Sequence, residues 1–209
     1  MTIIPYGVHT VALPELDAKL LAVPLRLAVV SRLAPNKRVD HTIRAIQCLR
    51  ELGVEAALKI VGAGESESEL RRLTQELSLQ ERVAFLGPLS EAEKDRCLME
   101  AHFILHASQR EGWGLNIIEA NALGTPAVVY PVAGLTEATL HDETGLVTEK
   151  ETPQDLARAL AESLKLPERY ERHRLNAWRR AKTFHWDAVL PKACEWLESR
   201  ARGKKEKES

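Results

Sequence analysis

Two glutamates, Glu111 and Glu119, stand in one short stretch that also carries two glycines, Gly112 and Gly114. Glycine has no side chain, so the backbone at these positions can approach a ligand closely. A carboxylate accepts hydrogen bonds from neighbouring sugar hydroxyls, and each charge-assisted bond contributes roughly 1.5–3 kcal/mol. We therefore predict that Glu111 binds a sugar and Glu119 a ribose. The competing interpretation is a solvated loop acid at 111 and a solvated helix acid at 119.

The residues that follow Gly114 predict the start of a helix. Apolar side chains recur with helical spacing from Leu115 to Ala122. The amides of Leu115, Asn116 and Ile117 would then point out of the helix N-terminus, where an anion such as a phosphate is favoured. A ligand with a phosphate between a sugar and a ribose is a nucleotide-sugar, so this is the ligand that the stretch predicts.

Two cations, Arg32 and Lys37, follow the first apolar run of the chain. They lie in a loop that leads to a predicted helix N-terminus. The guanidinium fork of an arginine can bind two phosphate oxygens, and a lysine adds a point charge. Both are candidates for binding a diphosphate. As isolated residues they would equally fit two solvated surface bases.

The elements that position these residues alternate between strand and helix. Apolar runs typical of buried parallel strands begin near residues 27, 57, 83, 102 and 127, with helical patterns between them. This alternation predicts an α/β fold, a doubly wound, Rossmann-like parallel sheet with helices on both faces. Ligands of such sheets bind beyond the carboxyl ends of the strands, so the loops after strands are the informative segments.

Two helix starts are marked by their residue types. Ser90, with Glu93 three positions later, has the spacing of a capping box. Thr152 followed by Pro153 is a typical helix N-terminus, because proline is tolerated at the first helical position. Helical patterns continue from there to Arg202.

The stretch around the two glutamates resembles the paired-glutamate signature of the group-1 family of retaining glycosyltransferases, enzymes of the GT-B fold. The match is long and specific, and the wider resemblance covers nearly all of residues 25–202. The residues that carry the signature are Ser108, Glu111, Gly112, Trp113, Gly114, Leu115, Glu119, Ala120, Ala122, Gly124 and Pro126.

The resemblance implies a role for each candidate residue. The donor diphosphate is held at the positions of Arg32 and Lys37, and Glu111 lies near the donor sugar; these three are the catalytic candidates. Ser31 stands where the family usually has glycine. The loops that carry Leu89 and Gly134 resemble donor-contacting segments. Core packing is the alternative for Leu89. The donor-binding candidates are Glu119, Gly112, Trp113, Gly114, Leu115, Asn116, Ile117, Leu89 and Gly134.

The resemblance corresponds to one GT-B half-domain, the C-terminal donor-binding half, followed by C-terminal helices. We expect residues 1–24 to be a lead-in with a remnant of the family's hinge at residues 6–9. Residues 25–202 would form the nucleotide-sugar-binding domain, and residues 203–209 a disordered tail. The expected partner is an N-terminal acceptor-binding domain or subunit, because in the family that half supplies the acceptor site. Contact of the tail with an anionic membrane surface is the alternative for its charges.

Composition excludes several classes of protein. A net charge of −1 argues against a nucleic-acid binder. Three widely spaced cysteines suggest neither a disulfide framework nor a zinc site and fit a reducing cytoplasm. His102 and His106 would stand about 13 Å apart on a strand, so one metal ion cannot reach both. We expect no metal, as the resemblance also implies, no other cofactor and no membrane span.

The predicted function is therefore transfer of a hexosyl group from a UDP-, GDP- or ADP-sugar to an acceptor, with retention of configuration. The isolated chain would be incomplete for turnover. The alternative is a non-catalytic module that senses nucleotide-sugars or docks a transferase. A nicotinamide dehydrogenase is disfavoured, because the turn with Gly62 and Gly64 lacks the third glycine of a dinucleotide fingerprint.

Overall fold

The computed structural model describes residues 7–8 and 15–205, and the side chains of residues 201–205 lie outside that description. Within these residues, one sheet runs in the order β3-β2-β1-β4-β5-β6 and all its neighbouring strands are parallel. This confirms the predicted doubly wound sheet. The strands are β1 (Leu25–Val30), β2 (Ala56–Val61), β3 (Val83–Gly87), β4 (Phe103–His106), β5 (Ala127–Val129) and β6 (Gly145–Val147).

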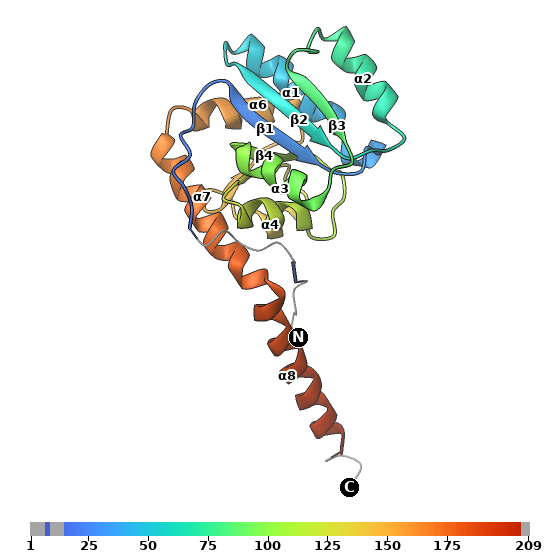
Figure 1. Cartoon of the computed structure of the whole chain (residues 1–209), viewed down its shortest axis with the longest axis vertical. Coiled ribbons are helices and arrows are strands. Elements are labelled where there is room, and N and C mark those ends of the chain that lie inside the picture. Colours follow the sequence, from blue (N-terminus) through green and yellow to red (C-terminus); the bar gives the residue numbers. More distant parts are fainter. Residues whose placement is uncertain (1–6, 9–14, 206–209) are drawn as a thin grey trace.

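Helices cover both faces of the sheet (Figure 1). They are α1 (Val39–Glu51), α2 (Glu67–Glu76), α3 (Glu91–Glu100), α4 (Leu115–Ala122), α5 (Leu135–Ala138), α6 (Pro153–Ser163), α7 (Pro167–Ala181) and α8 (Trp186–Lys205), with short 3-10 turns η1 (Pro35–Lys37) and η2 (Lys182–Phe184).

The sheet separates two hydrophobic cores, because successive side chains of a strand point to opposite faces. Leu27 and Val29 of β1 belong to the core formed with α1, α2 and α6. Ala28, between them, belongs to the core formed with α3, α4 and α5. Both faces of β1 are therefore buried from Leu27 to Val29, which explains the continuous apolar run in this part of the strand.

The predicted helix starts are confirmed. The Ser90 side chain accepts a hydrogen bond from the Glu93 amide, and the Glu93 side chain accepts one from the Ser90 amide, which is the reciprocal capping box. Thr152 accepts a hydrogen bond from the amide of Asp155 and caps α6. These bonds satisfy amides that a helix N-terminus otherwise leaves without partners.

The strand order fixes where a ligand can enter the sheet. β1 lies beside β2 on one side and beside β4 on the other, so the chain direction across the sheet reverses between β1 and β4. The loop after β1 leads to α1 in the first core, and the loop after β4 leads to α4 in the second. The two loops therefore diverge at a topological switch point, the usual ligand crevice of such sheets.

The segment before β1 has no regular structure within residues 15–24 and lies against the domain. The Lys19 ammonium donates to the carbonyl of Ala101 and to the Thr125 hydroxyl. Arg174, fully buried on α7, donates to the carbonyls of Asp17 and Gly124. The predicted hinge positions 6 and 9 lie outside the described residues.

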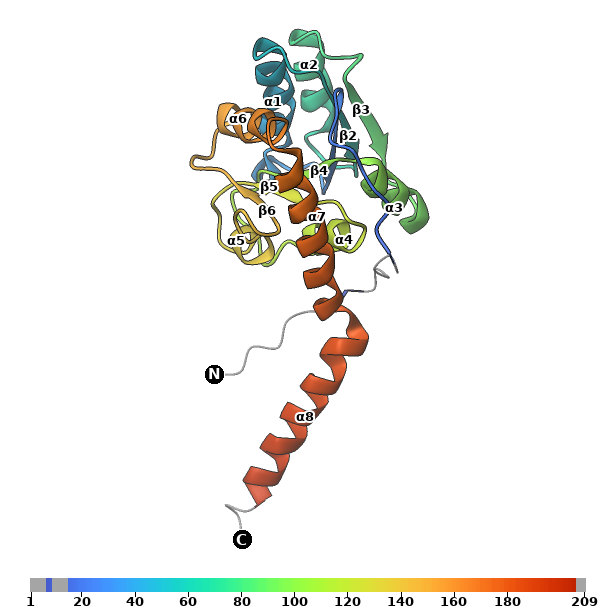
Figure 2. The ribbon, with the colours of Figure 1, turned by 90° about the vertical axis from the view of Figure 1, so that its left-hand side faces the viewer.

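Helix α8 extends away from the sheet (Figures 1 and 2). Leu190 and Leu197 on this helix are exposed. The helix continues to Lys205, beyond the boundary at residue 202 expected from the sequence, and residues 206–209 lie outside the described part. In the part of the chain that the structure describes, no helix is both long enough and apolar enough to cross a membrane.

Candidate functional site

A cavity of about 490 Å³ opens where the loops after β1 and β4 diverge. Most of the residues singled out in the sequence meet there, although they come from segments far apart in the chain. The cavity is lined by Ser31, Arg32, Lys37, His106, Glu111, Gly112, Trp113, Gly114, Leu115, Asn116 and Glu119.

Helix α4 begins at this cavity. Gly114 is its N-cap with φ of +67°, a left-handed conformation that glycine adopts without strain. The Asn116 side-chain amide donates to the carbonyl of Val30 at 2.6 Å and so fixes the start of α4 to the end of β1. The amide of Ile117 donates to the carbonyl of Gly114. The amides of Leu115 and Asn116 have no acceptor within the helix, so both can donate to an anion.

Glu111 is held by two partners from other segments. Its Oε2 atom lies 2.7 Å from Lys37 Nζ and 3.3 Å from His106 Nε2. The side chains of Lys37 and Glu111 are only 21% and 19% exposed, so solvent screens this pair less than a surface pair. The His106 ring and the Lys37 ammonium, acting against burial, lower the pKa of Glu111 to about 2. Glu111 is thus an ionised, oriented hydrogen-bond acceptor.

The loop that carries Glu111 rests on Gly134. Gly134 has φ of +82°. A Cβ atom there would lie 2.3 Å from the carbonyl oxygen of Glu111 and 3.0 Å from that of Gly112. No side chain fits at such distances. Gly134 therefore supports the Glu111 loop from behind and does not line the cavity.

Arg32, unlike Lys37, has no close partner and can bind a ligand without breaking a strong ion pair. Its side chain is 68% exposed, and Nη2 lies 3.9 Å from Glu65 Oε1, a pair that contributes little because water surrounds both groups. The Ser31 hydroxyl next to it is buried and has no partner among the described residues. The end of β1 thus carries an exposed guanidinium that is only weakly paired and a buried hydroxyl without a partner among the described residues.

Glu119 borders the other end of the cavity and is also paired. Its Oε2 atom lies 3.0 Å from Lys94 Nζ of helix α3, and the same ammonium lies 2.7 Å from Glu91 Oε2. Glu119 is therefore not a simple solvated helix acid. Trp113, between the two glutamates in sequence, packs edge-on against Phe184 with ring centroids 4.8 Å apart.

Two further predicted donor contacts, besides Gly134, lie away from the cavity. Leu89 is partly buried and packs against the core under α3 and α4. Ile117 is fully buried in the same core. Neither lines the cavity in this structure.

Three residues of the site were not assigned to it from the sequence. The sequence favours His106 as a strand residue with local contacts over a metal ligand, although its position at the carboxyl end of a strand is a signal for the ligand crevice. Ser31 was noted only for departing from glycine. Lys94 gives no local signal at all, since its partner Glu119 lies 25 positions away. His102, which directly precedes β4, is buried and accepts a hydrogen bond from the Arg26 amide.

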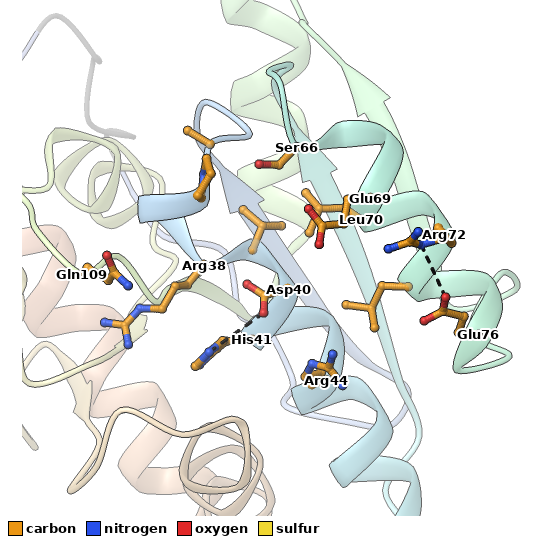
Figure 3. Close-up of a pocket in the computed structure, with 14 residues that line it drawn as sticks. Arg38, Asp40, His41, Arg44, Ser66, Glu69, Leu70, Arg72, Glu76 and Gln109 are labelled. Carbon is orange, nitrogen blue, oxygen red and sulfur yellow. Dashed lines mark ion pairs between the residues drawn. The ribbon is translucent and has the colours of Figure 1, made fainter.

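A second cavity, of about 400 Å³, lies between α1 and α2. Figure 3 shows Asp40 and His41 of α1 on one side and Arg72 and Glu76 of α2 on the other, with an ion pair drawn in each couple. Arg38 is likewise paired, with Glu151. Several ionic groups of this second cavity are thus paired with one another or with Glu151, and the cavity contains neither Glu111 nor Glu119. Among the described residues no cluster of three or more histidine, cysteine or acidic side chains could hold a metal ion.

Residues 21–180 match the protein-family model described as glycosyl transferases group 1. The D-inositol 3-phosphate glycosyltransferase of Corynebacterium glutamicum (strain R) is 31% identical over 184 residues, which cover 84% of this chain and 44% of that enzyme. The enzyme of the same name from Nocardia farcinica is 35% identical over 168 residues, which cover 77% of this chain and 37% of that enzyme. The chain spans less than half the length of these relatives.

Solved structures show the same architecture. Anabaena Alr3699/HepE, in complex with UDP-glucose, superposes with a TM-score of 0.76 at 25% identity, over 84% of this chain and 49% of that one. Sucrose-phosphate synthase from Thermosynechococcus elongatus superposes with a TM-score of 0.77 at 25% identity, over 96% of this chain and 52% of that one. Both match the Rossmann-like sheet predicted from the sequence.

Proposed function

The chain belongs to group 1 of the glycosyl transferases, and on that premise we propose that it is the nucleotide-sugar-binding half of a retaining transferase. Its fold is that of one half of a GT-B enzyme. The observation that carries the proposal is the single cavity in which Arg32, Glu111 and Glu119 converge on the free amides at the start of α4.

The diphosphate of the donor would lie between Arg32 and the start of α4. Arg32 can form two parallel hydrogen bonds with phosphate oxygens, and the amides of Leu115 and Asn116 add donors at the positive end of the helix dipole. Ser31 supplies a hydroxyl with no other partner. These groups would also stabilise the charge that grows on the leaving phosphate as the glycosidic bond breaks. No metal ion is required in this scheme, because cations and amides carry the charge.

Lys37 and Glu111 would act on the sugar side of the diphosphate. Glu111 presents an ionised carboxylate whose Oε2 atom is already held by Lys37 and His106, so Oε1 is left to accept hydroxyls of a hexose. Lys37 keeps two further N–H donors for the phosphate nearest the sugar. Glu111 serves as a hydroxyl acceptor in this proposal. Retention would follow from attack on the face from which the phosphate departs, guided by that phosphate.

Transfer to an acceptor would need a further half. The curated relatives are more than twice as long as their matched part, so the acceptor site is proposed to lie on an N-terminal domain or a partner subunit. HepE was solved with UDP-glucose. A UDP-sugar is accordingly the first donor to test, before GDP- and ADP-sugars. Free cysteines at positions 48, 97 and 194 are consistent with a cytoplasmic location, which is part of the proposal.

Titration calorimetry with UDP-, GDP- and ADP-glucose, in the presence of EDTA, tests the proposal. Arg32→Ala should weaken the tightest of these donors about ten- to hundredfold, because one charge-assisted contact is lost. Arg72→Ala is the matched control: its side chain is 70% exposed, close to the 68% of Arg32, and its ion pair with Glu76 is equally superficial. Failure of the native chain to bind any of the three nucleotide-sugars would overturn the proposed function.

A further inference from the structure

The ammonium of Lys94 contacts Glu119, which lines the cavity, without lining the cavity itself. It reaches from the first turn of α3 to Glu119 of α4 and is only 12% exposed. Its Nζ atom lies 3.0 Å from Glu119 Oε2 and 2.7 Å from Glu91 Oε2. Burying an ammonium is costly unless acceptors replace the lost water. Both carboxylates supply that replacement.

The two acids that hold Lys94 differ in their surroundings. Glu91 is 83% exposed and contacts solvent, whereas Glu119 is 25% exposed and borders the cavity. Burial alone would lower the pKa of Lys94, but the hydrogen bonds with Glu91 and Glu119 raise it above its usual value. Lys94 is therefore charged at neutral pH.

Only one oxygen of Glu119 is used in this contact. Oε2 accepts from Lys94, and Oε1 has no hydrogen-bond partner among the described residues. Glu111 is held in a similar way. Lys37 donates to its Oε2 atom, and its Oε1 atom has no hydrogen-bond partner among the described residues. In both cases a lysine from a neighbouring element fixes the carboxylate plane.

Glu119 is the acid that the sequence predicts to accept the hydroxyls of a nucleotide ribose. We propose that Lys94 is a positioning residue that orients Glu119 for this contact and thereby makes the site prefer ribonucleotides to deoxyribonucleotides. The inference rests on the proposed function, since it needs a nucleotide in the cavity. A glutamate side chain has several rotatable bonds, and fixing them on binding costs free energy. A carboxylate held in place beforehand avoids that cost.

Calorimetry of a nucleoside diphosphate against its deoxy counterparts separates this role from a general structural one. The probe is whichever of UDP, GDP and ADP binds the native chain most tightly, with its 2′-deoxy and 3′-deoxy forms. The native chain should bind the ribonucleotide at least about tenfold more tightly than one or both deoxy forms, the equivalent of one lost charge-assisted hydrogen bond.

Lys94→Met should lower the ribonucleotide affinity and reduce this preference to about twofold or less, while leaving the affinity for the deoxy form that the native chain disfavours nearly unchanged. Glu119→Gln should do the same, and the double variant should lose no more preference than either single variant. Lys59→Met is the control, because Lys59 also lies 2.7 Å from an acid of α3, Glu100, but away from the cavity. That variant should keep the native preference.

The outcomes distinguish the two proposals. If the native chain binds the ribonucleotide and Lys94→Met keeps its preference, or weakens all three nucleotides equally, the role of Lys94 is overturned and the donor site stands. Equal binding of ribo and deoxy forms by the native chain overturns it in the same way. If no nucleoside diphosphate binds the native chain, the donor site itself fails. Circular dichroism and thermal unfolding identify a variant that is misfolded, and Glu119→Gln then supplies the decisive comparison.

Discussion

The two glutamates of the cavity are positioned in different ways. Glu111 lies in a loop, and its place depends on Lys37 from η1, His106 from β4 and the backbone of Gly134. Glu119 lies within α4, where regular hydrogen bonding sets the direction of the side chain, and it needs only Lys94 from α3. The position of Glu111 therefore depends on tertiary contacts, whereas the position of Glu119 depends mainly on the helix that carries it.

This difference predicts that the Glu111 end is the more easily disturbed. A helix residue keeps its backbone position when one neighbour is changed, because the turns on either side hold it. A loop residue without such bonds moves when a supporting contact is lost. Substitutions that act on the Glu111 loop should thus have larger effects than equivalent changes near Glu119.

The largest effect is expected at Gly134. Gly134→Ala would place a Cβ atom 2.3 Å from the carbonyl oxygen of Glu111, on a backbone with φ of +82°. We expect a loss of roughly 3 kcal/mol or more in the free energy of unfolding, measured by urea denaturation, because both strain and overlap must be relieved.

Gly53→Ala supplies the matched control for that substitution. Gly53 has a similar φ of +74°, but an added Cβ would meet no atom within 4 Å. The expected cost is only about 1–2 kcal/mol, from the backbone conformation alone. Equal losses for the two variants would show that the contact between Gly134 and the Glu111 loop is unimportant.

A smaller effect is expected from Glu111→Gln, and it should depend on the sugar. If Glu111 accepts hexose hydroxyls, the variant should bind the best nucleotide-sugar about tenfold more weakly, while its affinity for the corresponding nucleoside diphosphate changes little. Calorimetry with both ligands measures the difference. Glu119→Gln should weaken both ligands together, since each carries the ribose. A reversed pattern would exchange the assignments of the two acids.

The smallest effect concerns stability in acid. The pKa of Glu111 is lowered in the folded chain from 4.5 to about 2, chiefly by His106 and also by Lys37. A depressed carboxyl pKa stabilises the folded state above pH 4.5, and that contribution is lost as the pH falls towards 2. Once solvent screening is allowed for, the native chain should have lost about 1 kcal/mol from this group by pH 3.5, a loss that Glu111→Gln should not show.

Asp142 provides the comparison for the acid experiment. Its pKa is also lowered to about 2, by Arg169 first and His173 second, but its side chain is 47% exposed. Solvent screening reduces what such a pair contributes. Asp142→Asn should therefore remove less of the pH dependence than Glu111→Gln in urea denaturation at pH 7 and pH 3.5. A larger change for Asp142→Asn would contradict the ranking.

The sequence alone determined the type and approximate bounds of the main elements. Alternation of buried apolar runs with helical patterns reflects the side-chain periods of strand and helix, which are local properties. The helical pattern between the first two apolar runs is observed as Val39–Glu51, and helices begin as predicted after Ser90 and Thr152. The signature around Glu111 and Glu119 likewise located the loop and helix that border the cavity.

Only the tertiary structure decided how the site is completed. The sequences of β1 and β4 do not indicate that the two strands pair. Their pairing brings Arg32 and Lys37 to the cavity that contains Glu111. The contacts of His106 with Glu111 and of Lys94 with Glu119 likewise arise from packing. Sequence patterns encode what each segment forms by itself, whereas the pairing of side chains across segments depends on strand order and helix packing, which are properties of the whole chain.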